Sequence, residues 1–132
     1  MAQLFSLGII RTLLVKLFLS LLGILAFGAG CKTGDEQFRD RVVGTWRIET
    51  ATVIYRHDGS FQFENSAGQY KWRNSGTWLV KDGYLINKIT NSWAENTSVK
   101  APVGRVGHSK ITFVDTHKLV TLDNSGICTL RR

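Results

Sequence analysis

Turn-forming residues interrupt this 132-residue chain at short, regular intervals after residue 42. Two of the interruptions are Asp58-Gly59 and Asp82-Gly83, and Asp-Gly tolerates the positive φ angles of tight hairpin turns. The segments between the turns are rich in Thr, Val, Ile and aromatic residues, which favour strands over a long helix. The expected strands are residues 44–57, 60–65, 69–74, 76–81, 84–91, 108–114, 118–123 and 127–131.

Apolar and polar residues alternate within several of these segments. In QYKWR the rings of Tyr70 and Trp72 oppose the charges of Lys71 and Arg73, and in SKITF the Ile and the Phe share one face. A two-residue period indicates strands with one apolar and one wet face. We therefore predict an all-β fold, a small antiparallel up-and-down barrel of about eight strands, because closure removes exposed sheet edges.

The first thirty residues have a different character. Their charges are Arg11 and Lys16, residues 17–30 carry none, and the stretch ends in Gly28-Ala29-Gly30. This order is typical of a helical secretory signal peptide, here residues 1–30. The uncharged run is shorter than the roughly 20 apolar residues of a membrane span. An uncleaved anchor, with Lys16 snorkelling toward the headgroups, is the alternative.

Cys31 stands at the border between this apolar run and a charged segment. Ala29-Gly30-Cys31 resembles the lipobox of bacterial lipoproteins, although Gly28 occupies the place of an aliphatic residue. The resemblance implies that Cys31 carries lipid, with palmitate-like acyl chains, and becomes the new amino terminus. The alternatives are ordinary cleavage at this border, which leaves a soluble exported protein, and a disulfide between Cys31 and Cys128.

The same resemblance implies a location in the cell envelope. Lys32 follows the cysteine, whereas enteric bacteria use Asp there to retain lipoproteins in the inner membrane. The expected place is therefore the outer membrane, facing the periplasm, with residues 31–41 as a tether that closes into at most one helical turn. Loss of Arg11 and Lys16 lowers the formal charge from +7 to +5. That charge would attract anionic headgroups or simply keep the surface soluble.

A second resemblance covers about residues 42–131. Val43-Gly44-Thr45-Trp46 resembles the Gly-x-Trp signature of lipocalins, in which the Trp plugs one end of the barrel. Gly76-Thr77-Trp78 and the two Asp-Gly hairpins are similar to pieces of the small lipocalin-like domain of bacterial exported proteins. The resemblance implies a lipocalin-like barrel over residues 42–132. Arg131 is the best-placed candidate for the arginine that covers the Trp in that family.

A barrel of eight strands either encloses one small ligand or is filled by its own side chains. The first hypothesis is a monomeric module that binds a small apolar or amphipathic ligand. The second is an envelope interaction protein with a filled core that binds a protein or an anionic surface through its loops. Trp93 and Val103, in the long polar loop 91–107, would form a lid or pack against the outer surface. The expected ligand-binding residues are Trp46, Phe61, Phe63, Tyr70, Trp72, Trp78 and Phe113.

The sequence predicts no enzyme, cofactor or metal centre. His57 and His117 lie beside acidic residues in predicted turns, but no Ser or Cys occupies a nucleophile elbow. The spacing of His108, His117 and Cys128 matches no zinc motif. Rings that point inward cannot stack on bases, so the QYKWR segment argues against nucleic-acid binding.

Overall fold

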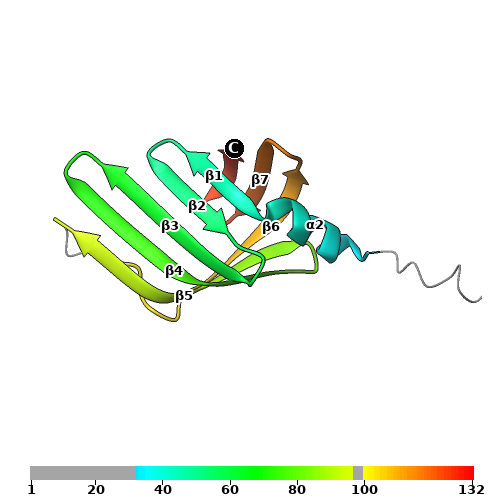
Figure 1. Cartoon of the computed structure of the whole chain (residues 1–132), viewed down its shortest axis with the longest axis horizontal. Coiled ribbons are helices and arrows are strands. Elements are labelled where there is room, and N and C mark those ends of the chain that lie inside the picture. The colour runs from blue at the N-terminus through cyan, green and yellow to red at the C-terminus, as the bar shows by residue number, and fades with distance from the viewer. Residues whose placement is uncertain (1–31, 97–99) are drawn as a thin grey trace, which may run out of the picture. The chain divides into compact units, whose positions relative to one another are not determined.

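The structure, a computed structural model, describes residues 32–96 and 100–132. These residues form a closed barrel of eight antiparallel strands, in which each strand pairs with the next along the chain and β8 pairs with β1 (Figure 1). The predicted all-β, up-and-down architecture is confirmed. The expected signal helix and Cys31 lie outside the described residues.

One short helix, α2 (Gly34–Val42), precedes the barrel. The strands are β1 (Gly44–Ile48), β2 (Ala51–Tyr55), β3 (Ser60–Ala67), β4 (Tyr70–Lys81), β5 (Tyr84–Glu95), β6 (Val106–Val114), β7 (Lys118–Asp123) and β8 (Gly126–Arg131). Within the parts of the chain that the structure describes, no helix has the length and apolar character needed to cross a membrane.

The single long strand expected over residues 44–57 is instead two strands. β1 and β2 form a hairpin in which Ile48 pairs with Ala51. Glu49 begins the two-residue turn with a φ of 48°, in the left-handed region. This turn contains none of the usual turn residues, because Glu49-Thr50 offers no Gly, Pro, Asn or Asp.

The opposite correction applies to residues 69–74 and 76–81, which were expected to be two strands. They are one strand, β4, and Gly76 lies within it rather than in a turn. The register with β5 shifts between Ser75 and Gly76, where a Cβ atom on Gly76 would lie 1.9 Å from the carbonyl oxygen of Lys88. Gly76 therefore permits a close approach of two backbones at a bulge.

A second bulge reverses the direction of one predicted inner residue. The register between β6 and β7 shifts between Ile111 and Phe113, and the hydroxyl of the intervening Thr112 donates to the carbonyl oxygen of Val120 at 3.1 Å. Ile111 and Val114 are buried, whereas Phe113 is 47% exposed. The prediction that Phe113 shares the inner face with Ile111 is wrong, because the extra residue changes the alternation.

The predicted long loop is shorter than expected, because β5 continues to Glu95. Trp93 lies opposite Arg73 across β4 and β5, with the guanidinium 5.8 Å from the ring centroid. Arg73 also bonds Glu64 of β3, so these three side chains share the outer face. Val103 is 65% exposed. A lid made of Trp93 and Val103 is therefore not formed.

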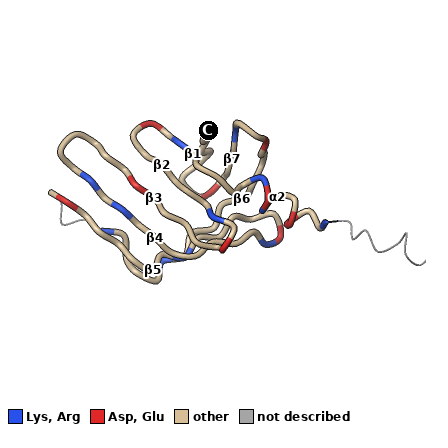
Figure 2. The backbone as a smooth tube through the Cα atoms, in the orientation of Figure 1, with Lys and Arg blue, Asp and Glu red and all other residues tan. Residues whose placement is uncertain are grey.

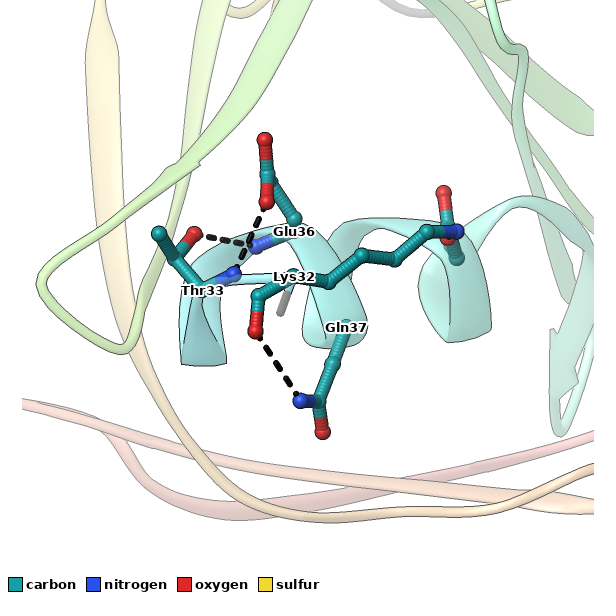
Figure 3. Close-up of polar contacts among 5 residues, drawn as sticks. Lys32, Thr33, Glu36 and Gln37 are labelled. Atoms are coloured by element: carbon teal, nitrogen blue, oxygen red, sulfur yellow. Dashed lines mark hydrogen bonds and ion pairs between the residues drawn. The ribbon is translucent and has the colours of Figure 1, made fainter. Parts of the chain in front are cut away.

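Helix α2 occupies most of the segment that was expected to be a tether. It begins with a capping box, in which the Thr33 hydroxyl accepts from the Glu36 N–H at 3.3 Å and the Glu36 carboxylate accepts from the Thr33 N–H at 2.8 Å (Figure 3). The Gln37 amide donates to the Lys32 carbonyl oxygen at 3.2 Å, and Lys32 forms an ion pair with Asp40. These bonds satisfy N-terminal groups that a short helix would otherwise leave unpaired.

The helix is fastened to the barrel at both of its ends. The Asp35 carboxylate accepts from the N–H groups of Asp82 and Gly83 at 2.7 and 2.9 Å, which caps the turn between β4 and β5. At the other end, Val42 is fully buried, and its carbonyl oxygen accepts from the indole of Trp46 at 2.7 Å. Helix α2 is thus part of the folded barrel.

Arg132 covers the buried Trp46. Its guanidinium lies 4.4 Å from the centroid of the Trp46 ring and donates to the carbonyl oxygens of Val43 and Arg41 at 2.7 and 3.0 Å. A Cβ atom on Gly44 would lie 2.9 Å from this guanidinium, so glycine leaves room for it. The covering arginine is therefore Arg132 and not Arg131.

We predict that Arg132→Met lowers the free energy of unfolding by about 1–2 kcal/mol, because it removes a cation–π contact and two charged hydrogen bonds but keeps an apolar stem. Arg131→Met is the matched control and should change stability by less than about 0.5 kcal/mol, since Arg131 is exposed on the last strand. Urea unfolding followed by Trp fluorescence measures both. Equal losses in the two variants would contradict the assigned role of Arg132.

Candidate functional site

The two ends of the barrel differ in how they are closed. In an up-and-down barrel, alternate connections lie at the same end, so the β2–β3, β4–β5 and β6–β7 turns share the end at which α2 enters β1. Arg39 of α2 donates to the carbonyl oxygen of His57, in the β2–β3 turn, at 3.1 Å. We call this the helix end. The opposite end, with the β1–β2, β3–β4, β5–β6 and β7–β8 connections, is the open end.

The interior at the helix end is filled. The rings of Tyr55 and Trp78 meet edge to face at 5.1 Å, and the Trp78 indole donates to the carbonyl oxygen of Arg56 at 3.0 Å. Trp46 and Leu119 are fully buried. The buried residues of this cluster are Val42, Trp46, Val53, Tyr55, Phe61, Trp78, Leu85, Ile111, Val114, Leu119 and Leu130.

Beyond this packed layer lies an inner cavity of about 390 Å³. Buried Tyr55, Phe61 and Leu85 contribute both to the packed layer and to the cavity lining, so they form its floor. A volume of this size falls within the range of small-molecule pockets. The remaining lining residues are Ile48, Val53, Phe63, Asn74, Asn87, Ile89, Ala101, Arg105, Gly107, Ser109, Thr121, Asp123, Cys128 and Leu130.

Asn87, which lines this cavity, has one unsatisfied polar atom. Its amide nitrogen donates to the hydroxyl of Tyr55 at 3.2 Å, while its Oδ1 atom is buried and has no hydrogen-bond partner among the described residues. If the amide were turned over, its nitrogen would be the unpaired end. Either way, a buried amide with one unpaired end carries an energetic penalty.

Tyr55 remains neutral at physiological pH. Burial raises the pKa of its hydroxyl from 10.0 to about 12, and the hydrogen bond from Asn87 opposes that shift only partly. Two neutral polar groups, Tyr55 and Asn87, therefore stand together in an otherwise apolar part of the cavity wall. They can orient a ligand by hydrogen bonds without requiring it to be charged.

A second hollow adjoins the inner cavity at the open end. This mouth groove has a volume of about 470 Å³ and lies between the first residues of β4 and the loop before β6. Tyr70 is 45% exposed there, because the β3–β4 hairpin extends beyond the paired part of β5 and β6. The groove is lined by Tyr70, Trp72, Asn74, Lys100, Ala101, Pro102 and Arg105. Asn74, Ala101 and Arg105 line both hollows, so the two are adjacent.

The seven residues expected to bind a ligand separate into four groups. Phe61 and Phe63 line the inner cavity, and Tyr70 and Trp72 line the mouth groove. The remaining three residues line neither hollow. Trp46 and Trp78 belong to the packed layer, and the side chain of Phe113 is exposed on the outer face of the barrel.

Sequence reasoning missed the polar residues of both hollows. Asn87 alternates in phase with Leu85 and Ile89, so its inward direction was readable from the strand pattern. Arg105 belongs to an irregular segment, in which Gly104 donates to the carbonyl oxygen of Ile89 at 2.7 Å and returns the chain toward β5. No periodic signal marks such a position.

The histidines do not form a catalytic or metal centre. His57 and His117 lie in turns at the helix end and His108 is exposed on β6, whereas Cys128 lines the inner cavity. Among residues 32–96 and 100–132, no three His, Cys, Asp or Glu side chains gather as metal ligands would. Burial raises the pKa of the Cys128 thiol, which disfavours the reactive thiolate.

The acidic neighbours of the turn histidines cap turns. Asp58 accepts from the N–H and hydroxyl of Ser60 at 2.8 and 2.6 Å, and Asp115 accepts from the N–H groups of His117 and Lys118 at 2.7 Å each. These hydrogen bonds hold the pKa of both carboxyls below the usual value. Neither carboxylate orients an imidazole, because the His117 ring nitrogen Nδ1 contacts the Thr116 hydroxyl instead.

Neither protein-family models, nor curated proteins, nor solved structures match this chain.

We predict a loss of stability above pH 10 that depends on Tyr55. A folded-state pKa near 12 against 10.0 for the free side chain means that the folded protein holds this proton more tightly. The stabilisation is complete below pH 10 and is lost as the pH rises toward 12, by about 1.4 kcal/mol per pH unit. Urea unfolding of the native chain and Tyr55→Phe at pH 9 to 12 measures it. Parallel pH profiles would contradict the buried, neutral state of Tyr55.

Proposed function

We propose that the barrel is a binding module that holds one small apolar or amphipathic molecule in its inner cavity, and that it is not an enzyme. The observation that carries this proposal is the inner cavity itself, with an apolar floor and a few polar side chains, among them Asn87 and Ser109, in its lining. An apolar pocket with a few converging polar groups is the usual form of a small-molecule site.

The distribution of polar groups supports an amphipathic ligand in particular. The floor is apolar, while Ser109, Thr121 and Asn87 provide hydroxyl and amide groups along the strands above it. The hollow of about 390 Å³ is open to solvent, so a molecule can enter it from outside the barrel. A ligand that buries its apolar part on the floor and hydrogen-bonds the wall fits both features.

We also propose that the chain is an exported lipoprotein, anchored through Cys31 and facing the periplasm from the outer membrane. The signal-like residues 1–30 and the lipobox-like border support this, as does Lys32 after the cysteine. Only Lys32 separates Cys31 from Thr33, the N-cap of α2. Because α2 lies at the helix end, the anchored barrel would direct its mouth groove away from the bilayer.

We propose that this barrel belongs to the small lipocalin-like domains of exported bacterial proteins. The pairing of Trp46 with a covering arginine supports it, since the indole lies under Arg132 at the point where the first strand begins. The eight-stranded meander agrees with the same proposal.

A second candidate function is protein interaction at the envelope. It is favoured by Ile127, which is 76% exposed, and by Leu122, its direct partner across β7 and β8. Exposed apolar neighbours of this kind often mark interaction surfaces. Native mass spectrometry of protein isolated from its source membrane separates the candidates: a retained small molecule favours ligand binding, and a clean apo mass favours interaction.

We predict that Ala101→Trp abolishes binding of the neutral apolar fluorophore N-phenyl-1-naphthylamine, because an indole at the junction of the two hollows occupies the path to the inner cavity. Ile127→Trp is the matched control, since it adds the same group on the outer face. The fluorescence of the bound probe is titrated for the native barrel and both variants. Unchanged binding to Ala101→Trp, or loss in Ile127→Trp alone, would place the probe outside the cavity and count against this proposal.

We predict that Cys31→Ser abolishes acylation and releases the protein from membranes, because Ser offers no thiol for a thioether. Membrane fractionation and the intact mass of the mature protein measure the two effects. Cys128→Ser is the control and should leave both unchanged. Membrane retention with an unaltered mass increment in Cys31→Ser would refute the lipid anchor.

A further inference from the structure

We infer that the ligand is an anionic amphiphile, whose acidic head group lies in the mouth groove beside Arg105 and Lys100 and whose apolar part enters the inner cavity. This inference rests on the proposed ligand-binding function and names the class of ligand. It follows from the adjacency, the charge and the aromatic lining of the two hollows.

The loop before β6 borders both hollows. Arg105 lines both hollows, and its backbone is fixed on each side: its N–H donates to the carbonyl oxygen of Pro102 at 3.1 Å, and its carbonyl oxygen accepts from the N–H of Ile89 at 2.9 Å. A cation is thus held at the boundary between an apolar cavity and an open groove. A molecule that spans this boundary would place its own polar group there.

The charges at the open end favour an anion in the groove. Lys100 and Arg105 line it, and no acidic residue does. Among the described residues, the ion pairs are Lys32–Asp40 and Arg73–Glu64, so neither groove cation has a carboxylate within salt-bridge distance. Figure 2 shows basic and acidic residues interspersed along the chain of the barrel, whereas the charged residues that line the groove are both basic.

The acids on the neighbouring strands do not line the groove. Glu64 faces outward and bonds Arg73, and Glu95 lies opposite Lys71 across β4 and β5, in a register next to that of Trp72. Asp123 lines the inner cavity but not the groove. Its carboxylate accepts from the N–H of Ser125 at 2.7 Å, in the β7–β8 turn. The groove therefore keeps an uncompensated positive character.

The aromatic residues Tyr70 and Trp72 complete the site. They line the groove together with the two cations, and each ring has an apolar body and a polar end. Such side chains suit the junction between an apolar chain and its charged head. Carboxylates and phosphates share the geometry that Arg recognises by paired hydrogen bonds, so both are candidate head groups.

The test compares ligands with one tail and different heads. Residues 32–132 contain the closed barrel and its core, so the barrel is assayed without residues 1–31. Decanoate, decyl phosphate and decanol each compete with N-phenyl-1-naphthylamine, all below their micellar concentrations. We expect at least one acid to bind about ten- to a hundred-fold more tightly than decanol. The preferred acid then identifies a carboxylate or a phosphate head group.

Charge-removing variants locate the head group. Arg105→Gln and Lys100→Gln should each weaken binding of the preferred acid and leave decanol unchanged, and added salt should weaken the acid alone. Lys71→Gln is the matched control, because Lys71 lies at the same end of β4 but opposes the inward Trp72. Lys100→Gln lies on an exposed loop, so it keeps the test valid if Arg105→Gln does not fold.

Two different failures are distinguishable. If decanol binds as tightly as both acids, or if the Gln variants weaken all three ligands equally, the anionic head group is overturned while the cavity function stands. If neither the fluorophore nor any competitor binds, the proposed function fails and this inference fails with it.

Discussion

The barrel depends on the burial of one indole, that of Trp46. The ladder between β1 and β8 contains a single pair, Arg47 with Arg131, so hydrogen bonds between the first and last strands contribute little to closure. Trp46 instead joins three parts of the chain, because it bonds Val42 of helix α2, lies in β1 and is covered by Arg132 after β8. A buried aromatic side chain contributes more than one strand pair does, and here it also satisfies its polar N–H.

The same arrangement explains why the interior is filled at the helix end and hollow toward the open end. Large apolar side chains gather around Trp46 at the helix end, where α2 closes the barrel. At the open end, β3 and β4 stay paired to Tyr70, whereas β5 continues to Glu95, beyond its last pair with β6 at Lys88. The bulge at Gly76 bends this ribbon, and the strands beyond it no longer converge on a common core. The short loop that carries Ala101 covers part of this opening, so the space beneath remains a cavity with a side entrance.

The sequence allowed the fold class to be predicted, because turn residues and alternation act locally. The predicted number of strands agrees with the structure only because one missed boundary and one extra boundary cancel. It misplaced features that depend on a partner strand. Glu49 adopts a positive φ without a turn signal, because the hairpin register of its neighbours imposes it. A strand boundary was expected just before Gly76, whereas this glycine lies within β4 and permits the close approach of the Lys88 carbonyl group. No local sequence pattern reveals such an approach. Phe113 faces outward and not inward, because the bulge in β6 adds one residue between Ile111 and Phe113. Only the pairing with β7 determines where such a bulge lies. Part of the site, above all Arg105, lies in an irregular segment before β6, where no alternation of apolar and polar residues indicates the direction of a side chain.

Net charge alone explains little about what this protein binds. The ion pairs Arg73–Glu64 and Lys32–Asp40 are exposed, and pairs of that kind contribute at most about 1 kcal/mol each. A cation beside an apolar cavity acts differently, because the neighbouring low-dielectric interior lets its field reach further than it would in water. The backbone hydrogen bonds of Arg105 fix the start of its exposed side chain between the two hollows. Selectivity between neutral and acidic amphiphiles would therefore come from Arg105 and Lys100 beside the groove and not from the overall positive surface, whose effect salt screens within about 10 Å.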